Sequence, residues 1–340
     1  MRYKPLRPAV PFLCILLSLF LLAASSCSQK KPAFRVHVVG FPEGEGQEER
    51  NTLLDYATRR VEAELGAYVE MEIPGSRHVG APEADIHTQD FDLLLTFGSE
   101  LPGPASGAGG DAEGASTPRW VCLDWQGEEK AAGPEGATFI RYRVEEGAYV
   151  CGFLAASLTA AGVHPLTNPQ PVAAFLGWEK DPRLKDFREG FGRGFQAALP
   201  DGKLLEYRVA EGDEVSRARS LAEEAVKKGA DIIFCTPGDF NEGVLQVAES
   251  RGILVILVGC DRSSSSPRHV LTSLVLRDDN AAFRAVEAAI RGELPTGVLE
   301  WGAEEGVWSL APFLGHDIYV NRELKEALER ETSRAAGMDF

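Results

Sequence analysis

The sequence lacks the short motifs on which many enzyme and metal sites depend. It contains no GxxxxGK[ST] phosphate loop, no GxSxG nucleophile turn and no HExxH zinc motif. Gly44-Glu45-Gly46 has no third glycine at Glu49, and the surrounding glutamates would repel a pyrophosphate. The six histidines are scattered without metal-ligand spacing, and we interpret each as a surface or structural residue. We therefore expect a protein that is not an enzyme, with no cofactor and no metal.

Cysteine and positive charge are also scarce. Four of the six cysteines, Cys122, Cys151, Cys235 and Cys260, stand mostly in apolar runs, and without a CxxC spacing they indicate small buried side chains. The formal net charge is −16. This acidity argues against nucleic acid and anionic lipid surfaces as partners. After Cys27 no apolar run is long enough to cross a membrane.

The N-terminus has the pattern of an export signal. A basic flank precedes an apolar run that ends Ala23-Ala24-Ser25-Ser26-Cys27. We expect a signal peptide over 1–26, lipidation of Cys27 and a lipid-anchored tether over 27–33. The alternative is cleavage by an ordinary signal peptidase, which would leave Cys27 free. In either case the mature protein is expected to be exported, and with the lipid it is held at the cell membrane on the periplasmic or cell-surface side.

The rest of the chain alternates predicted strands with predicted helices. Strands 91–97 and 253–259 are continuous apolar runs, which is typical of parallel sheets covered by helices on both faces. The alternation continues over two lobe lengths, so the sequence predicts an α/β protein with two doubly wound parallel-sheet lobes. The segment 98–118, rich in glycine, alanine, serine and proline, is expected to be a surface loop.

One predicted helix, 186–199, combines aromatic residues with glycines. Phe187, Phe191 and Phe195 are spaced by four, while glycines stand between them although each costs a helix about 1 kcal/mol relative to alanine. We expect Phe191 and Phe195 to be core. Gly190 and Gly194 are expected to allow close approach of a neighbouring helix, whereas Gly192 has no such explanation.

Polar and aromatic residues at strand ends are the candidate binding positions. Asp124, Trp178 and Asp261 each end or follow a predicted strand, and Phe187 lies early in the helix after Trp178. Ligands of doubly wound sheets bind beyond the carboxyl ends of the strands. A carboxylate can accept hydrogen bonds from a sugar diol, and an aromatic face can stack on a planar ring. These residues therefore predict a binding site for a small molecule.

Several segments resemble the basic membrane protein (BMP) family of bacterial lipoproteins, which are purine nucleoside receptors of ABC importers. The resemblance is carried by FDLLLTFGSEL (91–101), VAAFLGWEKDPRLKDFREGFGRGFQAALPD (172–201) and GILVILVGCDR (252–262), among others. It implies a type I periplasmic binding protein fold, with three hinge crossings and a cleft that closes on the ligand. The expected lobes are 34–143 plus about 277–296, and 144–276 plus about 297–340.

The resemblance also implies roles for individual residues. Phe187 matches the family's stacking phenylalanine, and Asp261 matches the aspartate that grips ribose hydroxyls. Asn51 matches the asparagine of the family's D-x-S-F-N element. The second stacking phenylalanine and the lysine of the family fall on Arg50 and Leu276 here. Trp125, Phe41 and Arg50 are the candidate substitutes, since a guanidinium can also stack on a base.

The resulting hypothesis is a lipid-anchored protein that captures a nucleoside-like solute for an ABC permease. One alternative is a surface lipoprotein that has lost transport and acts in sensing or adhesion. Another is a binding protein for a different polar solute.

Overall fold

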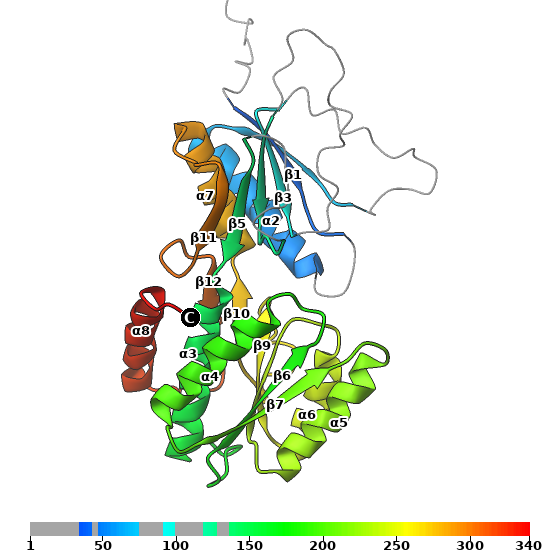
Figure 1. Ribbon diagram of the computed structural model, residues 1–340, viewed down its shortest axis with the longest axis vertical. Helices are drawn as coiled ribbons and strands as arrows, with labels where there is room; N and C mark the ends of the chain where they lie inside the picture. The colour runs from blue at the N-terminus through cyan, green and yellow to red at the C-terminus, as the bar shows by residue number, and fades with distance from the viewer. Residues whose placement is uncertain (1–33, 43–46, 75–90, 99–117, 128–135) are drawn as a thin grey trace, which may run out of the picture. The chain divides into compact units, whose positions relative to one another are not determined.

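A computed structural model describes residues 34–42, 47–74, 91–98, 118–127 and 136–340 (Figure 1). The described residues belong to one compact unit, Phe34–Phe340. The expected signal peptide (1–26), Cys27, the tether (27–33) and nearly all of the expected loop at 98–118 lie outside them. Within the described part of the chain, no helix is long and apolar enough to cross a membrane.

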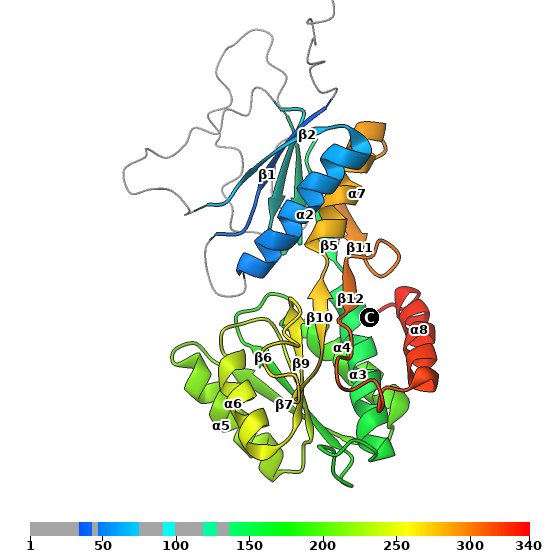
Figure 2. The ribbon, with the colours of Figure 1, turned by 180° about the vertical axis from the view of Figure 1, so that it is seen from behind.

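The first sheet has six parallel strands in the order β11-β5-β4-β3-β1-β2. The strands are β1 (Arg35–Val39), β2 (Tyr68–Glu72), β3 (Leu93–Phe97), β4 (Arg119–Leu123), β5 (Thr138–Tyr142) and β11 (Gly297–Trp301). Two helices, α2 (Gln47–Leu65) and α7 (Asp278–Arg291), pack together on this sheet (Figure 2). They bury Leu54, Val61 and Phe283 in its core.

The second sheet has six strands in the order β12-β10-β9-β8-β6-β7, parallel except for β12. The strands are β6 (Val172–Trp178), β7 (Lys203–Val209), β8 (Ile232–Cys235), β9 (Leu254–Gly259), β10 (Val270–Leu276) and β12 (Trp308–Leu310). The helices are α3 (Val144–Ala161), α4 (Leu184–Ala198), α5 (Glu214–Lys227), α6 (Asn241–Arg251) and α8 (Arg322–Ala336).

Successive residues of the central strands serve opposite faces of the second sheet. Phe175 and Phe234 belong to the core that α3 and α4 cover, whereas Ala174 and Ile233 belong to the core that α5 and α6 cover. Both faces therefore need apolar side chains, which explains the continuous apolar strands. The predicted α/β fold with two doubly wound sheets is confirmed.

The last crossing between the sheets differs from the expected boundary. The sequence predicted the second lobe from about 297 onward, but β11 pairs along its length with β5 and extends the first sheet. The chain returns to the second sheet only between Trp301 and Trp308. Both strands of the 297–310 region are short, so their sequence does not indicate which sheet edge each one extends.

Two of the three glycines of α4, Gly190 and Gly194, lie against α3, as the sequence predicted. A Cβ on Gly190 would collide with the carbonyl oxygen of Glu145, and one on Gly194 with that of Tyr149. The aromatic side chains of the same helix, Phe187, Phe191 and Phe195, are fully buried. Gly192 points elsewhere, and its nearest neighbour would be a methyl of Leu204 at 3.7 Å. The helix thus accepts two glycines because backbone meets backbone there.

Separate alanine substitutions of Gly194 and Gly192 compare a glycine needed for close helix contact with one that is not. We expect Gly194→Ala to lower the free energy of unfolding by about 1–3 kcal/mol, because the methyl forces the two helices apart. Gly192→Ala is expected to be neutral or to stabilise by up to ~1 kcal/mol, because only helix propensity changes. Urea unfolding of both variants measures this. Equal effects would contradict the close-contact explanation.

Candidate functional site

A hollow of about 270 Å³ lies where strand ends of the two sheets meet. On the side of the first sheet it is lined by Gln47 and Arg50 of α2 and by Gln126. On the side of the second sheet its lining includes Trp178, Arg183 and Asn241. Trp178 ends β6, and Cys260, also in the lining, directly follows β9. We call this hollow the cleft. Its position beyond the carboxyl ends of parallel strands is where doubly wound sheets bind ligands.

Arg50 lies between an aromatic ring and a buried carboxylate. Its guanidinium carbon stands 3.6 Å from the ring centre of Phe41, and its Nε donates to Oδ2 of Asp278 at 2.8 Å. Asp278 is fully buried and also accepts from the hydroxyl of Tyr142 at 3.2 Å. Burial opposes the charge of Arg50 most strongly, but the carboxylates of Asp278 and Asp124 together outweigh it and raise the pKa of the guanidinium. Arg50 is therefore a permanent cation.

Asp124 bonds to the second sheet through Arg183. Nη1 of Arg183 donates to both carboxylate oxygens of Asp124, at 3.1 and 3.0 Å. Asp124 directly follows β4 and has a φ of 50°, a left-handed conformation that is uncommon outside glycine. Arg183 precedes α4, and Asp181 accepts from its backbone N–H and its Nε. We call Arg50, Asp124, Arg183 and Asp278 the ion network.

Trp178 supplies the aromatic surface of the cleft. It is half-buried at the end of β6, and its backbone N–H donates to the hydroxyl of Thr236 at 3.0 Å. Cys260 is buried beside the cleft, and this burial raises the pKa of its thiol. A thiol with a raised pKa is a weak nucleophile at neutral pH. The lining thus offers charges, amides and one aromatic ring.

Phe187 and Asn51 are engaged within the protein. Phe187 is fully buried beside Phe234 and lies under Arg183, 5.4 Å from its guanidinium carbon. Asn51 accepts from the backbone N–H of Phe41 and donates to its carbonyl oxygen, both at 2.9 Å. Asn51 thereby fixes the ring on which Arg50 stacks. Direct ligand contacts of Phe187 and Asn51 remain predictions, and a contact with Phe187 requires Arg183 to move.

Asp261 and the aspartates of α7 have local hydrogen-bond partners. Oδ1 of Asp261 accepts from the backbone N–H and the hydroxyl of Ser263, at 2.9 and 2.6 Å, and its ribose contact remains a prediction. The pair Asp278-Asp279 at the start of a helix suggests helix caps from sequence alone, but no side-chain cap bond exists at the start of α7. Asp278 instead pairs with Arg50 across the chain, and Asp279 pairs with Arg277.

The position of the family's lysine contains no cation. Leu276 is buried and lines the cleft. The neighbouring Arg277 donates from Nη2 to Asp279 at 2.7 Å and is absent from the lining. Arg277 therefore does not take over the lysine's place in the cleft.

Three lining residues of the cleft, Arg183, Asp181 and Asn241, were not among the site residues predicted from the sequence. The sequence Asp181-Pro182 suggests a residue at a helix start, and Oδ1 of Asp181 accepts from both the backbone N–H and the Nε of Arg183. Asn241 follows β8 by a short turn, so the strand-end rule that selected Asp124 and Trp178 also points to this region. No local pattern identifies Arg183, because its partner Asp124 is 59 residues away.

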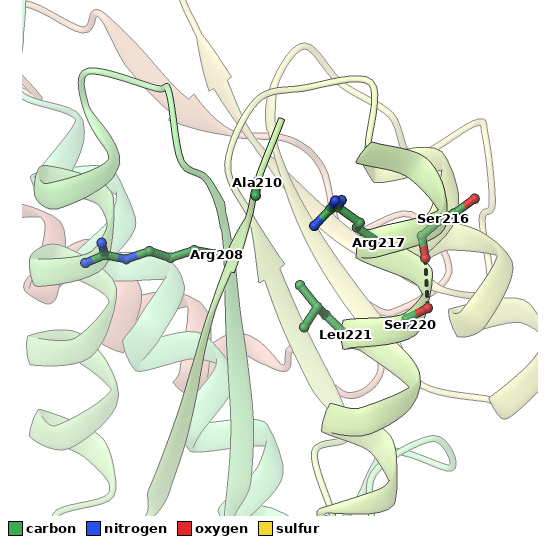
Figure 3. Close-up of a pocket in the computed structure, with 6 residues that line it drawn as sticks. All are labelled: Arg208, Ala210, Ser216, Arg217, Ser220 and Leu221. Atoms are coloured by element: carbon green, nitrogen blue, oxygen red, sulfur yellow. Dashed lines mark hydrogen bonds between the residues drawn. The ribbon is translucent and has the colours of Figure 1, made fainter. Parts of the chain in front are cut away.

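Two buried histidines and a second hollow lie outside the lining of the cleft. His164 and His316 are buried and share a hydrogen bond of 3.0 Å between their rings. Among the described residues, no group of three or more side chains could hold a metal. A hollow of about 340 Å³ lies between β7 and α5, where Arg208, Arg217 and Leu221 line it (Figure 3). Because only one sheet forms that hollow, the cleft is the better candidate site.

Comparison with solved structures identifies the fold. An ABC transporter system solute-binding protein from Conexibacter woesei aligns with a TM-score of 0.64 over 91% of this chain and 98% of its own, at 16% identity. A transcriptional activator of the comK gene from Bacillus halodurans aligns equally well, at 15% identity. At such identities the likeness shows the fold alone, which is the type I periplasmic binding protein fold.

Sequence comparison assigns the family. The model of the Bmp family, described as ABC transporter substrate-binding protein PnrA-like, matches residues 78–334, and the chain belongs to this family. Basic membrane protein A1 of Borrelia garinii subsp. bavariensis is 27% identical over 215 residues, which are 61% of this chain and 59% of that protein. Basic membrane protein B of Borreliella burgdorferi is 26% identical over 152 residues, 44% of this chain and 42% of that protein. The aligned region spans about half the length of these relatives.

Loss of the bond between Asp124 and Arg183 should destabilise the protein strongly. We expect Arg183→Met to lower the free energy of unfolding by about 3–5 kcal/mol, because the charge of Asp124 stays buried without its main partner. Arg188→Met, which breaks an exposed pair between α4 and Glu206 of β7, should cost about 0–1 kcal/mol. Chemical denaturation measures both variants.

A second substitution tests whether this loss comes from the unpaired charge. Asp124→Asn combined with Arg183→Met should cost less than the sum of the single changes. Additive effects, or an Arg183 variant as mild as the Arg188 control, would show that the pair contributes little.

Proposed function

We propose that this protein is a lipid-anchored substrate-binding protein that captures a nucleoside-like solute in the cleft for an ABC permease. The observation that carries the proposal is a cleft formed at the strand ends of both sheets, in a chain of the Bmp family. A solute held there touches both sheets at once. Binding would therefore favour one arrangement of the sheets over others, and a permease can respond to that arrangement.

The chemistry of the lining suits a solute that is flat on one side and polar on another. Trp178 offers an aromatic ring, and Arg50, layered on Phe41, offers a planar guanidinium. Both surfaces can stack on a base. Carboxylates in the lining, Asp181 and Asp239, can accept hydrogen bonds from sugar hydroxyls. No bond of the solute needs to be broken for this role.

Export and anchoring through Cys27 complete the proposal. They rest on the N-terminal sequence pattern, and a lipid there would keep the binding protein close to its permease. Mass spectrometry of the protein purified from membranes, with Cys27→Ser as the comparison, distinguishes lipidation from simple cleavage.

The second candidate function is a surface lipoprotein that senses or adheres without transport. It is favoured by the ion network, in which Arg183 already occupies Asp124, and by Leu276 at the family's lysine position. A cleft closed by its own side chains would respond weakly to solutes.

A thermal-shift screen against nucleosides, bases, sugars and amino acids separates these functions. A ligand that binds only the folded state stabilises it by ~2.7 kcal/mol at a hundredfold excess over Kd. We expect at least one nucleoside to raise the melting temperature. A shift only with sugars or amino acids would indicate another polar solute, and no shift with any compound would favour the non-transport function.

Trp178→Ala tests where the nucleoside binds. We expect its affinity to fall by roughly 1–3 kcal/mol, the size of one base-stacking contact. Tyr207→Ala, a half-buried aromatic on β7 outside the lining, is the matched control and should leave affinity unchanged. Calorimetric titration with the nucleoside found by the screen measures both. Equal affinities of the two variants would place the ligand away from Trp178.

A further inference from the structure

Asn241 has a buried acceptor without a partner. The residue begins α6, is 8% exposed and lines the cleft. Its Nδ2 donates to the carbonyl oxygen of Thr236 at 3.2 Å, which fixes the orientation of the amide. Its Oδ1 is buried and, within the described residues, accepts no hydrogen bond. Buried polar atoms are nearly always hydrogen-bonded, so this oxygen points to a partner that the described residues do not supply.

Gln47 shows the same feature on the other side of the cleft. It begins α2, and its Oε1 is likewise buried with no hydrogen-bond partner in the described part of the chain. Two residues with such an amide oxygen, one in α2 beside the first sheet and one in α6 beside the second, thus line the same hollow. An amide oxygen can only accept hydrogen bonds. The missing partner therefore has to be a donor.

The charges around the cleft favour a donor as well. Arg50 and Arg183 line it, but their guanidiniums are already engaged by buried carboxylates. Asp239 and Glu242, on either side of Asn241 in sequence, are exposed and line the cleft. Three guanidiniums and three carboxylates, Asp181, Asp239 and Glu242, line the cleft, and two further carboxylates, Asp124 and Asp278, lie behind the lining as partners of Arg183 and Arg50. This excess of acceptors attracts groups that carry hydrogens with partial positive charge.

Building on the proposed function, we propose that the cleft selects nucleosides whose base carries an amino group, which donates to Oδ1 of Asn241. An amino group has two hydrogens, so it can serve this oxygen and a second acceptor. An oxo group at the same place would present lone pairs to the lone pairs of Asn241 and leave Oδ1 unsatisfied. Asn241 is then the residue that determines specificity for the base.

Pairs of nucleosides that differ at the amino position test the proposal without any variant. Adenosine is compared with purine riboside, which lacks the amino group, and guanosine with inosine in the same way; cytidine is compared with uridine, which has an oxo group there. For the base type that binds, we expect the amino form to bind about 10- to 100-fold more tightly, because its loss leaves a buried acceptor unpaired. Calorimetric titration measures the affinities.

The variant Asn241→Leu assigns the effect to this residue. It retains the approximate size of the side chain and removes the acceptor, so we expect the ratio of affinities within each pair to fall toward one. Gln246→Leu, at an exposed position of α6 outside the lining, is the matched control and should keep the wild-type ratio. Unfolding curves of both variants show whether they fold. If Asn241→Leu does not fold, the comparison of ligand pairs on the wild-type protein decides the proposal.

The outcomes distinguish this proposal from the proposed function. Tight binding of nucleosides with equal affinity for amino and non-amino forms would overturn the role of Asn241 and leave nucleoside binding intact. A ratio that persists in Asn241→Leu would also overturn it. If no nucleoside binds at all, both the proposed function and this inference fail.

Discussion

The double hydrogen bond between Arg183 and Asp124 joins the strand ends of one sheet to those of the other, and the geometry of the cleft depends on it. Both side chains are largely removed from water, so each charge is costly unless the other is present. Arg50 and Asp278 form a second pair beside the first, and Nη2 of Arg50 stands 3.6 Å from Asp124. Opposite charges therefore alternate through the ion network, and removing one member leaves its neighbours uncompensated.

The ion network also determines which groups remain for a ligand. The guanidiniums of Arg50 and Arg183 are paired with carboxylates, so little of their charge is left for a ligand. They contribute mainly flat surfaces for stacking and the shape of the cleft wall. What remains is the ring of Trp178, the amide oxygens of Gln47 and Asn241, and exposed carboxylates. This differs from the family pattern described above, in which an aromatic residue and a lysine occupy the positions of Arg50 and Leu276. Membership of the Bmp family therefore does not determine the ligand of this particular cleft.

Local patterns in the sequence predicted the architecture and part of the cleft. Alternating apolar strands and helices predicted both doubly wound sheets, and the strand-end rule identified Asp124 and Trp178. The spacing of Gly190 and Gly194 predicted the close contact with α3. These features succeed because each is encoded within a few neighbouring residues.

The features that were missed depend on partners far apart in the sequence. Arg50 and Asp278 are separated by 228 residues, so nothing near Asp278 distinguishes a buried ion partner from a helix cap. Phe187 belongs to a stripe of three aromatic residues, and spacing alone does not tell which member, if any, faces a ligand. The sheet to which β11 belongs is decided by its pairing with β5, which a strand of five residues does not reveal.

The close contact between α3 and α4 has a mechanical consequence. Arg183 immediately precedes α4, and the carbonyl oxygen of Glu145, which meets Gly190, lies just after the point where the chain leaves β5. Backbone packed on backbone leaves no soft side chain to absorb a displacement. A displacement of Arg183 therefore moves α4 and α3 together as one rigid unit and reaches the connection between β5 and α3 at Arg143. The backbone then has to bend in the segments that join the two sheets and not within the helix pair.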